Sequence, residues 1–422
     1  MFNWRITPYD PSSPPLKRGR KTRPKILAEQ ITGRSYVRLI QDYLLRLRQT
    51  YQHPNRVLFY DDVVIVYLLA FFNPAIRSLR CIEHASQLPG VNRFLDVNAV
   101  CKSTLADANA LFDPIHLQGL IEQLHRKLPN LHQQDKQLEH LLEQVIVHDG
   151  SFFRVAADVA WAISSRNQYH DGGGQVRLNC QFCLRSGVPT GVSVNGSDGI
   201  GEGTAASAFI KSGHIYLFDG GVVSFPLLKT IVGAGSNFLC NLAPGVNFTE
   251  IQRRELSDED VEAGVLSDRV GRLSGSDTRE APDAVVREII IAYVARDGSP
   301  KTLRLLTTLL DLPPHQVGQL YRYRWQIELF FRWLKVHANF RHLTSHSRNG
   351  ITLSFYVAVI AAMLMCLQTQ RPLSRYGYNL LSMVAAGLGD VSDMLPILEQ
   401  QERQSQRERE RQARKQAAKK NV

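Results

Sequence analysis

The sequence predicts an α/β fold in which a helical N-terminal part precedes a sheet of alternating strands and helices. Between about residues 35 and 142, apolar residues recur at three- and four-residue spacing, which is typical of one face of a helix. From residue 143 onward, short β-rich runs alternate with helical segments, and this order of elements is characteristic of α/β sheets.

The expected strands of this sheet are short apolar runs that end at turn residues. They are VIVHD, VRLNCQFCL, GVPTGVSVNG, HIYLFD and NFLCNL, and helices are expected at EGTAASAFIKSG and FPLLKTIVGAG. Residues 243–305 are charged and rich in turns, and they include a hairpin signal at Asp297-Gly298. A long helix should begin near Pro313, followed by an apolar helix over 351–370.

We therefore divide the chain into five parts. Residues 1–35 form a basic flexible arm and residues 36–142 a helical N-terminal domain, which could be DNA-binding or simply a packing unit. The α/β core is expected in two stretches, 143–242 and 306–370, with a β-rich insertion between them at 243–305. A helical, basic tail follows at 371–422.

The positive charge of the chain is concentrated at its two ends. Of a net charge of +11, six charges come from an acid-free run near the N-terminus and four from residues 399–420, which hold eight Lys/Arg and four Glu. Basic arms on a nearly neutral body favour a nucleic acid partner over a membrane, although charged tails can also serve solubility alone. The N-terminal run consists of Lys17, Arg18, Arg20, Lys21, Arg23 and Lys25.

Three further features limit the possible classes of protein. Apolar residues at 44% and charged residues at 21% exclude wholesale disorder. The N-terminus has no signal-peptide pattern, and the uncharged stretch Ile351–Leu367 is better explained as a core helix than as a membrane span. Cys180 and Cys183 should point to opposite faces of a strand, so free thiols are expected rather than a metal site.

The segment YRYRWQIELFFRWLK, residues 321–335, carries a charged stripe on an otherwise apolar helix. Tyr321, Arg324, Glu328 and Lys335 fall within an arc of ~60° at 100° per residue. A carboxylate in such surroundings needs a cation or a metal, which makes Glu328 the strongest candidate for a functional residue. An ordinary helical ion pair with Arg324 or Lys335 is the alternative.

Two aspartates are candidates because each follows an expected strand. Asp149 ends VIVHD and Asp219 ends HIYLFD, and functional groups gather at the carboxyl ends of strands in α/β sheets. Either Asp-Gly pair could instead be a turn, and His148 should face away from the site. With Glu328 they would form three carboxylates suited to Mg²⁺ or Mn²⁺, and two such ions support phosphodiester displacement. Arg324 and Lys335 would then balance phosphate charge, and Tyr321 could donate a hydrogen bond or stack on a base.

The spacing Tyr-x2-Arg-x3-Glu-x6-Lys at residues 321–335 resembles the signature of bacterial DDE transposases of the insertion-sequence-4 family, which includes the Tn-five-type enzymes. The similarity extends to HDGSFF, FDGGVVSF and RHLTSHSRNG, and to AFFNPAIRSLRCIE and STLADANALFDP in the N-terminal part. One departure from the pattern is Gly220 after the second aspartate, where relatives often have Arg, and the run FLCNL likewise lacks a basic residue.

This resemblance implies an RNase H-like catalytic core with a β-rich insertion before the catalytic glutamate, in a cytoplasmic bacterial protein. It implies cut-and-paste DNA transposition at terminal inverted repeats, with Asp149, Asp219 and Glu328 binding two Mg²⁺ ions, or Mn²⁺. Tyr321, Arg324 and Lys335 would hold double-stranded DNA ends, and the enzyme would act as a homodimer in the synaptic complex. Two alternatives stay open: a catalytically decayed copy that only binds DNA, and a stand-alone nuclease without joining activity.

Overall fold

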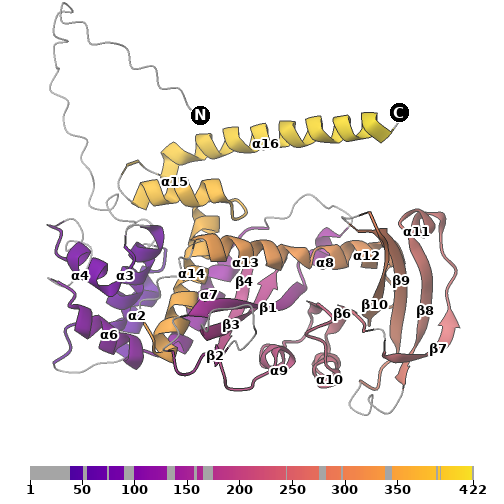
Figure 1. Cartoon of the computed structure of the whole chain (residues 1–422), viewed down its shortest axis with the longest axis horizontal. Helices are drawn as coiled ribbons and strands as arrows, with labels where there is room; N and C mark the ends of the chain where they lie inside the picture. Colours follow the sequence, from indigo (N-terminus) through magenta and orange to yellow (C-terminus); the bar gives the residue numbers. More distant parts are fainter. Residues whose placement is uncertain are drawn as a thin grey trace, which may run out of the picture.

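The computed structural model places one large mixed sheet at the centre of the molecule, with helices on both of its faces and at one end (Figure 1). The structure describes residues 39–50, 55–73, 76–89, 99–130, 138–155, 159–164, 174–243, 245–274, 282–295, 298–337, 345–385, 388–389 and 391–420. The basic run from Lys17 to Lys25 lies outside these residues, so its predicted contact with DNA stays a prediction.

Helices dominate the N-terminal part, as the spacing of apolar residues predicts. The turn at Asp113-Pro114 shows how one of them begins, because the Asp113 carboxylate accepts a hydrogen bond from the Ile115 N–H at 3.0 Å. The helices of this part are α2 (Gln41–Thr50), α3 (Tyr60–Phe72), α4 (Leu79–Ser86), α6 (Lys102–Leu111), η2 (Pro114–Leu117), α7 (Gln118–Lys127) and α8 (Glu139–Leu142).

The first half of the sheet contains antiparallel and parallel neighbours. β1 (Val145–Val155), β3 (Gly174–Cys183) and β4 (Val188–Asn195) are antiparallel, and the short β2 (Ile163–Ser164) pairs with β3. β5 (Ile215–Phe218) pairs in parallel with β1, and β6 (Asn237–Asn241) pairs in parallel with β5. The strand order through this half is therefore β4-β3-β1-β5-β6.

The β-rich residues after 243 continue the same sheet. β10 (Pro300–Thr307) pairs antiparallel with β6, and the order then runs β10-β9-β8-β7 to the far edge. β9 and β10 form the expected hairpin, whose turn residues 296–297 lie outside the described part of the chain. We call these strands and their helix the β extension: β7 (Asn247–Arg253), α11 (Asp258–Glu262), β8 (Val265–Ser274), β9 (Val286–Val294) and β10.

Helices on the two faces of the sheet separate two clusters of apolar side chains. α9 (Glu202–Ser207) and α10 (Phe225–Gly233) lie on one face, and α12 (Pro314–Arg322) and α13 (Trp325–His337) lie on the other (Figure 1). Cys180 belongs to the cluster beneath α13 and Cys183 to the cluster beneath α10, so the two thiols face opposite ways, as predicted. All six cysteines are free.

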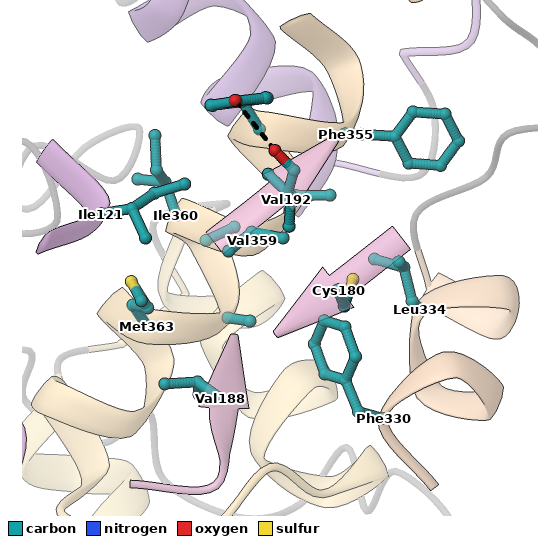
Figure 2. Close-up of a cluster of buried hydrophobic side chains, with 14 of the residues drawn as sticks. Ile121, Cys180, Val188, Val192, Phe330, Leu334, Phe355, Val359, Ile360 and Met363 are labelled. Carbon is teal, nitrogen blue, oxygen red and sulfur yellow. Dashed lines mark hydrogen bonds between the residues drawn. The ribbon is translucent and has the colours of Figure 1, made fainter. Parts of the chain in front are cut away.

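The apolar helix α14 (Arg348–Thr369) forms the centre of the larger cluster. By length and composition it could cross a bilayer, but 83% of its most apolar window is buried inside the molecule. Figure 2 shows Val359, Ile360 and Met363 of this helix between α7 and the strand side chains. The Tyr356 hydroxyl donates a hydrogen bond to the Val192 carbonyl at 3.1 Å, which ties α14 to β4. The predicted core helix is confirmed.

The C-terminal residues form α15 (Arg375–Ala385) and α16 (Val391–Lys420). The N-terminal helices, α14 and the start of α16 contribute to the same apolar cluster as the sheet. The boundaries at residues 142, 242, 305 and 370 therefore mark changes of secondary structure, and their status as domain boundaries stays a prediction.

Candidate active site

Asp149 and Asp219 lie side by side on neighbouring parallel strands. β1 and β5 are paired in register as far as His148 and Phe218, and the two aspartates are the next residue on each strand. Parallel register therefore places both carboxylates at the carboxyl edge of β5, in the middle of the sheet. The geometry of the two parallel strands therefore explains why Asp149 and Asp219 lie close together, as the sequence suggested.

The expectation that Asp149 ends its strand is wrong. β1 continues to Val155 because β3 goes on pairing with it, so Asp149 lies opposite Cys180 and Gly150 lies opposite Asn179. The alternative that Asp149-Gly150 is a turn is therefore wrong as well. Asp219-Gly220 does lie at a turn, in which the Val222 N–H donates to the Asp219 carbonyl at 3.1 Å.

The helix that carries the charged stripe is interrupted. A single helix from about Pro313 was expected, but α12 ends at Arg322 and α13 begins at Trp325. Between them the Arg324 N–H donates to the Tyr321 carbonyl at 3.0 Å and the Ile327 N–H donates to the Arg324 carbonyl at 3.3 Å. These three-residue bonds tighten the backbone, and no Pro or Gly in the sequence signals the break.

Helix α13 is held on the sheet by aromatic and aliphatic side chains directly beneath the site. The Phe330 and Phe182 ring centroids are 5.8 Å apart, and Figure 2 shows Phe330 and Leu334 beside Cys180. Because Cys180 is the strand partner of Asp149, this packing fixes the helix next to that aspartate. The rest of the helix is less enclosed than its composition suggests, since Trp325, Leu329 and Val336 are exposed.

Arg324 links two of the three carboxylates, Glu328 and Asp149. One of its guanidinium nitrogens, Nη2, donates to Glu328 Oε1 at 2.9 Å, and Nη1 lies 3.9 Å from Asp149 Oδ2. Burial by itself lowers the pKa of Arg324, but Tyr321, Asp219 and Glu328 raise it, and the net shift is upward. The helical ion pair that the sequence left open is therefore present, and its Arg324 also lies near Asp149 and interacts electrostatically with Asp219.

Asp149 has less positive charge around it than its burial requires. Burial raises its pKa to about 6, and Glu202 and Asp219 act in the same direction. The Gly150 N–H, which donates to Asp149 Oδ1 at 2.8 Å, and Arg324 lower the pKa but only in part. A half-buried carboxyl of this kind, at the carboxyl end of a parallel strand pair, has a pKa pattern found at functional sites.

Tyr321 and Lys335 occupy different surroundings. Tyr321 is buried, burial raises the pKa of its phenol, and the Arg324 guanidinium lies 5.8 Å from its ring centroid. Lys335 is exposed two turns after Glu328 on α13, where its Nζ lies 5.3 Å from the centroid of the Phe153 ring. The structure therefore brings Tyr321, Arg324 and Glu328 together with the aspartates, whereas Lys335 lies apart from them beside Phe153.

The donors at this edge of the sheet suit a hard divalent cation. Asp149, Asp219 and Glu328 offer carboxylate oxygens, which Mg²⁺ and Mn²⁺ prefer. Within the described part of the chain, no three Asp, Glu, His or Cys side chains are gathered closely enough to surround one ion as they lie. Arg324 instead supplies the positive charge between Asp149 and Glu328. The donor chemistry fits, and Arg324 is the group with which a bound cation would compete.

A cavity of about 990 Å³ opens from the site toward the β extension. Asp219 and Tyr321 line its inner end, and Tyr293, Arg322 and Trp325 line it further out. Its walls therefore join Asp219 to β9 and to both halves of the interrupted helix.

Known proteins similar to this chain are consistent with this geometry. The family described as the transposase DDE domain matches residues 140–364, which is more than half of the 422 residues. The chain belongs to this family.

Two curated relatives are bacterial. A Sinorhizobium fredii protein named as a transposase, y4zB, is 28% identical over 157 residues, 37% of this chain and 43% of the relative. A Geobacillus stearothermophilus protein named as a transposase for insertion sequence element IS5377 is 29% identical over 72 residues, 17% of this chain and 19% of the relative. The chain thus spans less than half the length of the curated relatives it matches.

A solved structure of piggyBac transposase in a synaptic complex with hairpin DNA has a TM-score of 0.37 with this chain. The two are 10% identical, and the similarity covers 88% of this chain and 78% of the other. A score of that size does not establish a common fold.

The segment shared with the DDE family contains Asp149, Asp219 and Glu328, and it also contains a polar cluster that the sequence did not suggest. On the opposite side of β1 from Asp149, Arg177 Nε donates to Asn179 Oδ1 at 3.0 Å and lies 3.8 Å from Glu202 Oε1. A Cβ on Gly150 would lie 2.5 Å from that Glu202 oxygen, so glycine here allows the carboxylate to approach the strand. The only sequence signal was the glycine itself.

His148 and Gly220 complete the account of the predicted positions. His148 is buried on the other face of β1 from Asp149, and burial lowers its pKa to about 3, so it is a neutral core residue, as predicted. A Cβ on Gly220 would lie 3.2 Å from the Asn241 carbonyl oxygen. The two departures from the insertion-sequence-4 pattern, at Gly220 and in FLCNL, are therefore neighbours in space.

Proposed function

We propose that this chain is a DNA transposase that moves an insertion sequence by cut-and-paste transposition. The observation that carries this proposal is the side-by-side placement of Asp149, on β1, and Asp219, directly after β5, with Glu328 joined to Asp149 through Arg324. Membership of the DDE family supports it, because the matched segment spans all three residues.

We infer that the core is RNase H-like and that the protein is of the insertion-sequence-4 type. The order β4-β3-β1-β5-β6, with three antiparallel strands followed by two parallel ones, supports the first inference. The spacing of Tyr321, Arg324, Glu328 and Lys335 supports the second, and so does the position of the β extension between Asp219 and Glu328.

In this proposal, two Mg²⁺ ions, or Mn²⁺, bind Asp149, Asp219 and Glu328. Bound there, they would supply Lewis acidity and an activated oxygen nucleophile for phosphodiester cleavage. The protein itself fixes the directions of the carboxylates: β1 and β5 hold the aspartates, and the packing of Phe330 and Leu334 holds α13. Arg324 keeps Glu328 near Asp149 before the ions and DNA arrive.

The DNA substrate is proposed to be the terminal inverted repeats and then the target duplex. Arg324, once released from Glu328, is placed to bind a phosphate at the cleavage point, and exposed Lys335 is placed to bind one further along the strand. Tyr321 is a protonated hydrogen-bond donor beside Asp219. The basic residues Lys17–Lys25 would add affinity, and a homodimer in the bacterial cytoplasm would assemble the two ends.

The test is cleavage of a labelled element end by the unaltered chain and by Glu328→Gln, each with Mg²⁺ and with EDTA. The variant should lose cleavage by at least ~10²–10³-fold while its affinity for the end stays within about threefold, because Gln keeps the shape but not the charge. Glu122→Gln, on the exposed surface of α7, is the matched control and should cleave normally.

Three outcomes are informative. Undiminished cleavage by Glu328→Gln would refute the assignment of the three carboxylates. Cleavage of the end without strand transfer would indicate a nuclease. Tight binding of the end without any cleavage by the unaltered chain would favour the decayed DNA-binding copy, for which Gly220 against Asn241 is the first place to look.

A further inference from the structure

The C-terminal helix α16 is a separate basic surface that the active site does not use. Figure 1 shows α16 extending along the molecule above the body of the chain, beyond α15. Among the side chains of α16 that the structure describes, the buried ones are Met394 and Leu398, both in its first part. From Glu399 onward the helix has few apolar residues, so packing does not explain its composition.

Four arginines share one side of this helix. Arg403, Arg407, Arg411 and Arg414 fall within an arc of about 80° at 100° per residue and cover about 16 Å of the helix axis. All four are exposed. We call this set the arginine face of α16.

The acidic residues of α16 do not neutralise this face. Glu399 and Glu402 both pair with Arg371, which precedes α15. Glu408 and Glu410 accept hydrogen bonds from Gln404 and Gln406 at 3.2 Å.

Arg403 alone among the four arginines has an acidic partner, Glu399, at 3.9 Å. No ion pair joins Arg407, Arg411 or Arg414 to a carboxylate within the residues that the structure describes. The arginine face is therefore open to an external anion along most of its length.

A linear row of guanidinium groups fits a linear polyanion. Duplex DNA carries one charge per ~1.7 Å of its axis, so a row of about 16 Å can meet several phosphates of one groove edge. Guanidinium groups bind phosphate oxygens in a bidentate manner. A second copy of the chain presenting the same face would be repelled, which makes DNA the better match.

We propose that the arginine face of α16 binds the phosphate backbone of duplex DNA without reading its sequence. This inference rests on the proposed function, because it supplies a second contact for the same DNA at a distance from the carboxylates. Its effect should appear as salt-dependent affinity and should be independent of cleavage.

The experiment measures binding of a random-sequence duplex by the full chain in EDTA, across a range of salt concentrations. Arg407→Gln, Arg411→Gln and Arg414→Gln are combined in one variant. The slope of log affinity against log salt should fall by roughly 2–3, at about 0.9 per lost phosphate contact. Glutamine has good helix propensity, and circular dichroism of the variant should show that α16 is retained.

The matched control removes the same charge elsewhere. Lys127, Lys229 and Lys301 are exposed on α7, α10 and β10, and their combined replacement by Gln should leave the slope nearly unchanged. An equal loss in this control would show that net charge alone governs binding and would overturn the proposal. An unchanged slope in the arginine variant, or a change only in its oligomeric mass, would also overturn it. Failure of the unaltered chain to bind duplex DNA would instead refute the proposed function together with this inference.

Discussion

The active-site edge and the β extension surround their carboxylates with different amounts of positive charge. In the β extension, Glu288 is fully buried between Arg304, whose Nε is 2.6 Å away, and Arg269. Asp268 and Arg287 are also buried and form two hydrogen bonds of 2.7 Å. Two carboxylates thus meet three guanidinium groups. At the active site, Arg324 lies next to two of the three predicted carboxylates, Asp149 and Glu328, and interacts electrostatically with the third, Asp219.

This difference separates a structural role from a ligand-binding role. Buried charges that are fully paired can be tolerated as part of the fold. Carboxylates with too little positive charge around them instead favour the binding of an external cation. The paired network also has a local task, because Arg287 Nη1 donates to the carbonyls of Leu309, Leu310 and Leu312. These residues immediately precede α12, so the β extension fastens the chain that leads to Tyr321.

The largest effect should come from breaking the paired network. Arg287→Ala leaves Asp268 buried without its partner and removes hydrogen bonds to the Leu309 and Leu312 carbonyls, and breaking a buried pair in this way costs roughly 3–5 kcal/mol. The free energy of unfolding, measured by urea denaturation, should fall by that amount. Arg253→Ala is the control, since its pair with Glu250 is exposed and screened by solvent and should contribute little to stability. Equal effects of the two substitutions would remove the basis of the comparison.

A smaller effect on stability is expected at Asp149, where protonation of the carboxyl stabilises the folded chain. Because its pKa is raised from 3.8 to about 6 in the folded chain, the folded state holds this proton more tightly than the unfolded state. The resulting stabilisation is complete below pH 3.8 and is lost as the pH rises through about 6. Between pH 4.5 and 7.5 the loss should be about 2 kcal/mol.

Asp149→Asn should remove this dependence. In EDTA, the unfolding free energy of the variant should rise relative to that of the parent by about 2 kcal/mol as the pH rises from 4.5 to 7.5. Asp283→Asn, at an exposed carboxylate on the β extension, serves as the control and should run parallel to the parent. If unfolding free energy plotted against pH were parallel for Asp149→Asn and the parent, the Asp149 carboxyl would already have enough positive charge around it in the folded chain.

The smallest effect on stability is expected at Lys335. Its side chain is exposed and touches only the Phe153 ring among the contacts described, so Lys335→Met should change the unfolding free energy by less than ~1 kcal/mol. The slope of log affinity for an element end against log salt should nevertheless fall by about 0.9 in this variant. Lys229→Met on α10 should change neither quantity. A large loss of stability at Lys335 would place it with the structural charges.

Parts of the fold followed directly from the sequence. The alternation of strands and helices after residue 143 predicted β3, β4, β5, β6, α9 and α10, and the two aspartates were found because each follows an apolar strand run. The spacing between Tyr321 and Glu328 identified the helix region that faces them. These signals are local, since they depend on side-chain periodicity and on the residues at the end of each run.

Other features depended on pairing between distant segments. β1 extends past Asp149 only because β3 continues beside it, and the residues after 243 join the central sheet only because β10 pairs with β6. Glu202 and Arg177 meet over Gly150 from separate elements. No periodicity in the sequence contains such information.

The sequence by itself determined which residues carry charge and where apolar runs begin and end, because these are properties of short segments. It therefore fixed Asp149, Asp219 and Glu328 as candidates and the basic character of the two ends. The tertiary structure decided how those charges are compensated, because the strength of an electrostatic interaction depends on distance and burial. It thereby distinguished the paired network of the β extension from the carboxylates around Arg324, which are short of positive charge.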